Sequence, residues 1–205
     1  MESKLEVKLK IILLALALGL ASCATSTENK NGLVLITESE YTEIAEKYTE
    51  KIQVYSGLYN LMDMSATLIN SSVAKAQLEQ TARLYQWDAA KMTTEKVKSD
   101  ENLGKETEIF ISFYTPERKH DDLNKNKTLW KIFMDANGKR YEGTIKKIKL
   151  LTDEVRGLYA YHTRFATPYS IVFPVSAKSI ENSNVKLTVT GPVGSATVQF
   201  KSLTL

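Results

Sequence analysis

Few residues of this chain have the type and spacing that catalysis requires. Its two histidines are His120 and His162, and serine hydrolysis needs a histidine beside a nucleophile and an orienting acid. His162 lies in the polar segment 159–164, and the sequence contains no Gly-x-Ser-x-Gly nucleophile elbow. We therefore predict that the chain has no catalytic residues and that His162 is hydrogen-bonded at a sheet edge or domain junction.

Two short motifs contain residue types that bind metal ions. Residues 120–122, His-Asp-Asp, combine imidazole with carboxylates, but no second histidine at helical spacing and no Cys-x-x-Cys accompanies them. Residues 135–138, Asp-Ala-Asn-Gly, begin like part of a calcium loop, but the glutamate that closes such a loop is missing. We expect a solvated loop at 120–122, a hairpin turn with positive φ at Asn137-Gly138, and no metal ion or cofactor.

The N-terminus has the pattern of an export signal. Lys4, Lys8 and Lys10 precede an apolar run of about 12 residues that ends in small residues, which is typical of a secretory signal. This run is too short to cross a bilayer, which takes about 20 apolar residues. The sequence thus predicts a signal peptide over residues 1–22 that is removed on export.

The end of this signal, Leu20-Ala21-Ser22-Cys23, resembles the lipobox of bacterial lipoproteins. In that family the cysteine receives a diacylglycerol, and a dedicated peptidase cuts before it. The resemblance implies lipidation at Cys23, with Leu20, Ala21 and Ser22 recognised by the signal peptidase. Ala24, in place of aspartate, implies anchoring in the outer rather than the inner membrane. The competing interpretation is an ordinary cleaved signal with an incidental cysteine.

Composition limits the classes of partner. Residues 1–22 carry three lysines and two glutamates, so the mature chain keeps a formal net charge of +2 of the original +3. A near-neutral chain without a clustered basic patch is not expected to bind nucleic acid. Cys23 is the single cysteine, so once it is acylated no disulfide can form and the fold depends on its hydrophobic core.

The first half of the mature chain has a helical pattern. Residues 23–36 are expected to be the lipidated cysteine and a tether that is flexible over the small, polar residues 24–32, whereas the apolar run 33–36 could be a strand or a packing segment. Thr37 begins a polar segment with candidate N-caps, and from there to about Leu103 the chain has no proline and one glycine, Gly57. Its apolar residues step by four and three: Tyr41, Ala45, Tyr48, Ile52, Tyr55, Tyr59, Met62, Ala66 and Ile69. This pattern predicts a helical arm over 37–103, either a hairpin of helices at 38–69 and 73–99 or one long kinked helix.

From about Gly104 the pattern changes to short alternating segments with turns between them. About seven strands are expected, at 107–114, 128–134, 140–150, 158–165, 169–175, 185–190 and 196–200. We therefore predict an α+β fold, in which the helical arm precedes an antiparallel β-sandwich over 104–205. The strand spacing is compatible with an immunoglobulin-like arrangement, although the Cys…Trp…Cys signature is absent.

These expectations point to a membrane-anchored envelope lipoprotein that acts as a non-catalytic structural or protein-interaction module. Its partners would be the membrane, through lipid on Cys23, and another envelope protein. The alternative is a carrier or assembly factor for a lipid or outer-membrane component, with an apolar cavity between helices and sheet. A hydrolase is a third class, and convergence of Glu43, Glu46 or Asp63 with His162 in one cleft would favour it.

Overall fold

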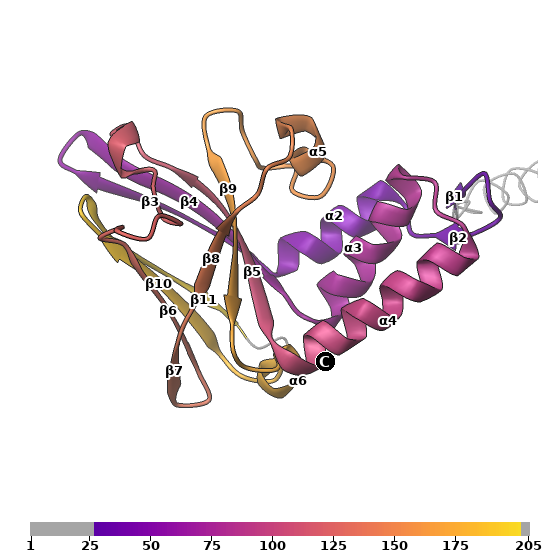
Figure 1. The fold of residues 1–205 in the computed structure, drawn as a ribbon. Coiled ribbons are helices and arrows are strands. Elements are labelled where there is room, and N and C mark those ends of the chain that lie inside the picture. The colour runs from indigo at the N-terminus through magenta and orange to yellow at the C-terminus, as the bar shows by residue number, and fades with distance from the viewer. Residues whose placement is uncertain (1–26, 202–205) are drawn as a thin grey trace, which may run out of the picture.

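The computed structural model describes residues 27–201, and these residues form two larger antiparallel sheets and a group of helices (Figure 1). The five-stranded sheet has the order β3 (Thr49–Ser56), β4 (Tyr59–Ile69), β5 (Thr107–Tyr114), β9 (Thr167–Phe173) and β8 (Thr144–Lys147). The four-stranded sheet has the order β11 (Gly194–Phe200), β10 (Val185–Gly191), β6 (Lys131–Ala136) and β7 (Lys139–Glu142). Cys23 and the lipobox residues Leu20, Ala21 and Ser22 lie outside the described residues.

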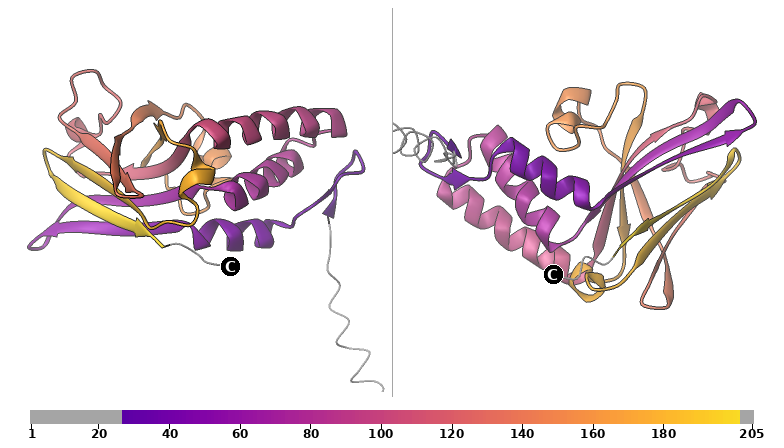
Figure 2. Two further views of the ribbon diagram at one scale, coloured as in Figure 1. Left: turned by 90° about the horizontal axis from the view of Figure 1, so that it is seen from below. Right: turned by 180° about the vertical axis from the view of Figure 1, so that it is seen from behind.

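Three helices are interleaved with the strands and lie together at one end of the five-stranded sheet, as Figures 1 and 2 both show. They are α2 (Glu38–Lys47), α3 (Ser71–Leu84) and α4 (Ala89–Lys105). Each begins at a polar N-cap: the side chains of Thr37, Asn70 and Asp88 accept hydrogen bonds from free backbone N–H groups of the first turn. The shorter helices are η1 (Arg118–His120), α5 (Thr152–Arg156) and α6 (Ala177–Ile180). No helix within residues 27–201 is both long and apolar enough to cross a bilayer.

The predicted N-terminal helical arm is wrong, both as a hairpin of two helices and as one kinked helix. The chain leaves the helical conformation after Lys47, and residues 49–69 form the β3–β4 hairpin around Gly57, whose φ is +60°. Tyrosine, valine, isoleucine and threonine are frequent in this segment and favour strands. Its apolar side chains also alternate, so that every second residue of β4 from Met62 to Leu68 is buried in the core. The segment therefore fits both a helical and a strand period, and its pairing with β5 selects the strand.

The segment 73–99 is likewise not one helix. Helix α3 ends at Leu84, and α4 begins at Ala89 after a turn in which Gln86 has a φ of 51°. Because β4 pairs with β5 along its length, residues before and after Gly104 share one sheet. The predicted fold, a helical arm followed by a sandwich built from 104–205 alone, is therefore wrong.

Two further strand expectations are corrected. The segment 140–150 divides at Gly143 into β7 and β8, which belong to different sheets. A Cβ on Gly143 would lie 2.4 Å from Cγ2 of Ile171, so glycine allows the chain to pass between the sheets here. Residues 158–165 form no strand and instead cross the outer face of the five-stranded sheet. By contrast, the hairpin turn at Asn137-Gly138 is confirmed, with φ angles of 51° and 74°.

The main core lies between the two sheets, which also approach at one side, where β11 lies against β3. It is built of aliphatic, sulfur-containing and aromatic side chains, including Met62, Met64, Ile111, Phe113, Trp130, Ile132, Met134, Tyr169, Ile171, Phe173, Leu187 and Val189. Trp130 is the largest of these side chains. Its ring packs edge-on to Phe113 at a centroid distance of 5.2 Å and fills the space that a Cβ on Gly191 would occupy.

Residues 27–32, which were expected to belong to a flexible tether, are part of the fold. β1 (Thr27–Glu28) pairs with β2 (Val34–Leu35), and the two-stranded ribbon lies at the end of the helices that is remote from the sheets (Figure 1). Asn29 is 8% exposed, and its side chain accepts hydrogen bonds from the N–H groups of Asn31 and Leu33. The predicted flexible tether is thus wrong for residues 27–32, because local hydrogen bonding outweighs their polar composition, and the apolar run 33–36 contains the strand β2.

Candidate functional site

A groove lies on the outer face of the five-stranded sheet, where the loop after α5 crosses strands β3, β4 and β5. The alternation of each strand sends one set of side chains into the core and the other set to this face. The outward set that lines the groove consists of Lys51, Gln53, Asp63, Ser65, Ser112 and Tyr114. Tyr161, Thr163, Phe165 and Ala166 of the crossing loop form the opposite wall, and the enclosed volume is about 730 Å³.

The crossing loop is fixed to the sheet by two tyrosines, the buried Tyr159 and the partly buried Tyr161. The ring of Tyr159 stacks on Phe110 with centroids 3.5 Å apart and planes 4° from parallel, and Gln77 Nε2 donates to its hydroxyl at 3.1 Å. Tyr161 is bonded to Thr67, at 2.5 Å between the oxygens. Burial raises the pKa of both tyrosines well above the ordinary value of 10.0, so their hydroxyls stay protonated.

The direction of the hydrogen bonds below Tyr161 follows from the end of the chain. Thr49 Oγ1 donates to the carbonyl oxygen of Ala45 at 2.8 Å, so it has no proton left for Thr67 Oγ1, which lies 2.7 Å away. Thr67 must therefore donate to Thr49, and the Tyr161 hydroxyl must donate to Thr67. This ordered series connects the crossing loop through β4 and β3 to the end of α2.

Ser112 of the groove floor forms a hydrogen-bonded pair with His162, which lies behind the groove lining. Ser112 Oγ lies 2.8 Å from His162 Nδ1, and the two side chains are 6% and 3% exposed. Burial, and next the positive charge of Arg156, lower the pKa of His162 below its ordinary value of 6.5. The imidazole is therefore neutral at neutral pH. Depending on the tautomer, Nδ1 either accepts a hydrogen bond from the Ser112 hydroxyl or donates one to it.

The structure identifies the hydrogen-bond partner of His162, which the sequence could not. The predicted hydrogen bond is present, but the predicted place at a sheet edge is wrong, because the partner Ser112, 50 residues away in the sequence, lies on the central strand β5. Alternation along 107–114 places Ser112 on the outer face of the sheet. No local pattern indicates that the loop folds back to bring His162 over it.

The carboxylates that would have indicated an enzyme lie in different places. Glu43 is on the exposed side of α2 and pairs with Lys47 at 3.3 Å. Glu46 lines a separate cavity of about 350 Å³ between α2 and the crossing loop. Asp63 is in the groove and accepts a hydrogen bond of 2.6 Å from Asn60 Nδ2. Glu43 and Glu46 also share a shallow depression on α2 with Thr42 and Arg83, whereas Asp63 lies apart from both of them.

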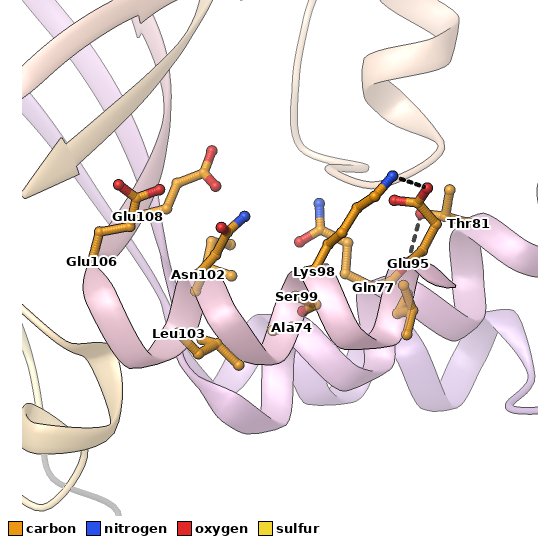
Figure 3. Close-up of a pocket in the computed structure, with 12 residues that line it drawn as sticks. Ala74, Gln77, Thr81, Glu95, Lys98, Ser99, Asn102, Leu103, Glu106 and Glu108 are labelled. Atoms are coloured by element: carbon orange, nitrogen blue, oxygen red, sulfur yellow. Dashed lines mark hydrogen bonds and ion pairs between the residues drawn. The ribbon is translucent and has the colours of Figure 1, made fainter. Parts of the chain in front are cut away.

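A third cavity, of about 320 Å³, lies between α3, α4 and the edge of the sheet (Figure 3). At one end Glu95 pairs with Lys98 at 2.9 Å and with Lys91 at 2.8 Å, and these hydrogen bonds lower the pKa of its carboxyl group. Glu106 and Glu108 lie at the other end, as Figure 3 shows. The walls of this cavity thus combine charged and polar side chains with the apolar side chains of Ile69, Ala74, Leu78 and Leu103.

The His-Asp-Asp motif is not the solvated loop that the sequence suggests. The Asp121 side chain is 6% exposed and accepts hydrogen bonds from Thr167 at 2.5 Å and Tyr169 at 3.0 Å, and it pairs with Arg118 at 3.1 Å. Trp130 Nε1 donates to the carbonyl oxygen of His120 at 2.8 Å, so this segment closes one end of the core. Among residues 27–201, no three His, Cys, Asp or Glu side chains are grouped so that they could hold a metal ion.

Comparisons with known proteins do not identify a family. No family model matches the sequence, and no curated protein matches it. Among solved structures, the chain is similar to a novel protein of unknown function from Burkholderia pseudomallei K96243. The two chains are 9% identical with a TM-score of 0.37, and the match covers 80% of this chain and 90% of the other. A similarity of this size says nothing about the function of either.

Proposed function

We propose that this chain is a membrane-anchored envelope lipoprotein that binds a protein partner, without catalysis, in the groove between the crossing loop and strands β3–β5. The observation that carries this proposal is the groove itself, which has a volume of about 730 Å³ and a floor of polar and aromatic side chains. The lipobox resemblance at Leu20-Ala21-Ser22-Cys23 supports the anchor.

The chemistry of the groove suits an extended segment of a partner protein. Lys51 and Asp63 provide one charge of each sign, and the serines of the floor can donate to or accept from peptide groups. Phe165 is 59% exposed, with the guanidinium of Arg164 4.8 Å from its ring centroid. Aromatic residues and arginine are enriched at protein interfaces, so Phe165 is the expected hydrophobic anchor.

The groove is also rigid before binding. The hydrogen bonds from Tyr161 through Thr67 to Thr49 hold the crossing loop, as does the stacking of Tyr159 on Phe110. A preformed wall avoids the ordering of side chains, which costs about 0.5–1.5 kcal/mol for each immobilised side chain. A rigid groove of this kind supports selective binding of a partner segment.

The alternative function, a lipid carrier, would require an apolar cavity between the helices and the sheet. The cavity at that place has apolar side chains in its walls, such as Leu78 and Leu103, but charged side chains line it as well: Glu95, Lys98, Glu106 and Glu108. An acyl chain gains free energy from contact with the apolar part of these walls, but the charged side chains would lose hydration without compensation. The interaction function therefore has the stronger support.

Site-specific photocrosslinking in intact cells tests the binding proposal. A crosslinking residue is placed at Gln53 in the groove, and the control is placed at exposed Lys139 on β7 of the other sheet. We expect a discrete protein adduct from position 53 that is absent from position 139 and is weakened by Phe165→Ser. The same adducts from both positions would contradict the proposal, and adducts of lipid alone would favour the carrier.

The anchor has its own test. Metabolic labelling with an acyl precursor should mark the wild-type chain, and Cys23→Ser should lose both the label and the membrane association. Ser22→Ala is the matched control, because a small residue remains before the cysteine. A chain that stays at the membrane after Cys23→Ser would show that the anchor lies elsewhere.

A further inference from the structure

The ribbon of β1 and β2 is firmly attached to the turn between α3 and α4. Asn29 Nδ2 donates to the carbonyl oxygen of Trp87 at 2.8 Å, and Asn31 Nδ2 donates to that of Gln86 at 2.7 Å. The Gln86 side chain accepts a hydrogen bond of 3.2 Å from the N–H of Lys30. The ribbon and the turn therefore form one rigid face at the end of the helices.

This face exposes apolar and aromatic side chains. Val34 of the ribbon is 68% exposed, and Leu84 and Tyr85 at the end of α3 are 46% and 59% exposed. Trp87, in the same turn, is half-buried, and Lys91 Nζ lies 5.7 Å from its ring centroid. Tyrosine and tryptophan with a nearby lysine are the residue types that concentrate at the boundary between lipid and water.

The sequence places the expected lipid very close to this face. Three residues, 24–26, separate Cys23 from Thr27, where β1 begins. Four steps of a fully extended chain span at most about 14 Å. An acyl chain on Cys23 starts at the membrane surface, so the ribbon must stay within that distance of the surface.

We infer that the face formed by the ribbon and the α3–α4 turn docks on the surface of the bilayer that holds the anchor. This inference rests on the proposed lipidation of Cys23. Val34, Leu84 and Tyr85 enter the headgroup region, and Trp87 lies at its edge. The turn of the β3–β4 hairpin lies at the opposite end of the molecule (Figure 1), so docking directs that end of the sheets away from the membrane.

The charges at this end of the molecule indicate which attraction dominates. Both signs are present: Glu28, Lys30, Glu38, Arg83, Asp88 and Lys91. Arg83 pairs with Glu38 at 3.3 Å, and Lys91 pairs with Glu95 at 2.8 Å. Because the charges nearly balance, docking depends on the apolar and aromatic side chains and on the short link to the anchor, and anionic lipid is not required.

Spin labelling of the acylated mature chain in phosphatidylcholine vesicles tests this inference. Cys23 is the single native cysteine and is acylated, so a second, introduced cysteine is the one thiol that reacts with a nitroxide. The label is placed by Tyr85→Cys, and the matched control is Tyr59→Cys, at a 79% exposed tyrosine beside the β3–β4 turn. Both positions are exposed, and circular dichroism checks that both variants are folded.

On reconstitution, we expect the label at position 85 to become severalfold more accessible to oxygen than to a water-soluble nickel chelate. The label at position 59 should remain fully accessible to the chelate. Equal, aqueous accessibility at both positions overturns the docking face, as does docking that appears only when anionic lipid is added. Mass spectrometry and vesicle flotation report the anchor separately: a chain without acyl groups that does not float overturns the anchor and this inference together.

Discussion

The two ends of the molecule are stabilised by different kinds of interaction. At the helical end, polar side chains such as Asn29 and Asp88 hydrogen-bond to backbone groups and fix short segments. At the sheet end, apolar side chains from distant parts of the chain fill a common core around Trp130. The proposed docking face is therefore held rigid by hydrogen bonds and needs little core, whereas the groove depends on the packing beneath it.

The two tryptophans give the largest expected difference between these ends. Trp130 is 2% exposed in the core, whereas Trp87 is half-buried at the helical end. Trp130→Ala should lower the free energy of unfolding by about 3–5 kcal/mol, because it leaves a large cavity between the sheets. Trp87→Ala should cost less than about 1 kcal/mol. Urea unfolding of both variants measures the difference, and equal losses would refute the contrast between the two ends.

A smaller and more local effect is expected at the ribbon. Asn29→Ala removes the side chain that bonds to Trp87, Asn31 and Leu33, and should cost about 1–3 kcal/mol. Hydrogen exchange should become faster at the ribbon amides and stay unchanged in β4 and β5. Asn31→Ala is the matched control, because the Asn31 side chain is exposed and makes one bond, to Gln86. Unchanged protection of the Leu33 amide in Asn29→Ala would contradict this prediction.

Buried His162 at the groove end should make the stability depend on pH below 6.5. The pKa of His162 is lower in the folded chain than its ordinary value of 6.5, so the unfolded chain binds this proton first as the pH falls. The contribution of His162 to stability should be complete above pH 6.5 and decline as the pH falls below that value toward the lowered pKa.

Urea unfolding at several pH values checks this contribution. His162→Gln should flatten the pH dependence below pH 6.5. Ser112→Ala keeps the buried imidazole and should retain most of the dependence, because burial is the larger cause of the shift. If Ser112→Ala removes the pH dependence as fully as His162→Gln does, the hydrogen bond between Ser112 and His162, and not burial, is the main cause of the lowered pKa.

The smallest effect on stability is expected for the exposed rim of the groove. Phe165→Ser should change the free energy of unfolding by less than about 0.5 kcal/mol, because the ring is 59% exposed. The same substitution should still weaken the crosslinked adduct from position 53. A loss of stability comparable to that of Asn29→Ala would show that Phe165 is a packing residue.

Features decided within a few residues could be predicted from the sequence. The N-cap at Thr37, the turn at Asn137-Gly138 and the strand at 107–114 are found where the sequence predicts them. Each depends on one hydrogen bond between neighbours, on a φ angle, or on strict alternation. The lipobox at residues 20–23 is equally local, and its role stays a prediction.

The tertiary structure decided the features that depend on pairing across the chain. The segment 49–69 matches both a helical and a strand period, and its pairing with β5, beyond two intervening helices, selected the strands. The groove arises in the same way, because Ser112 and His162 meet only after the loop crosses the sheet. Closing such long loops costs entropy that local sequence does not report, and the burial of the shared core offsets it. The sequence alone therefore determined the turns, the caps and the expected anchor, and the packed sheets determined the groove.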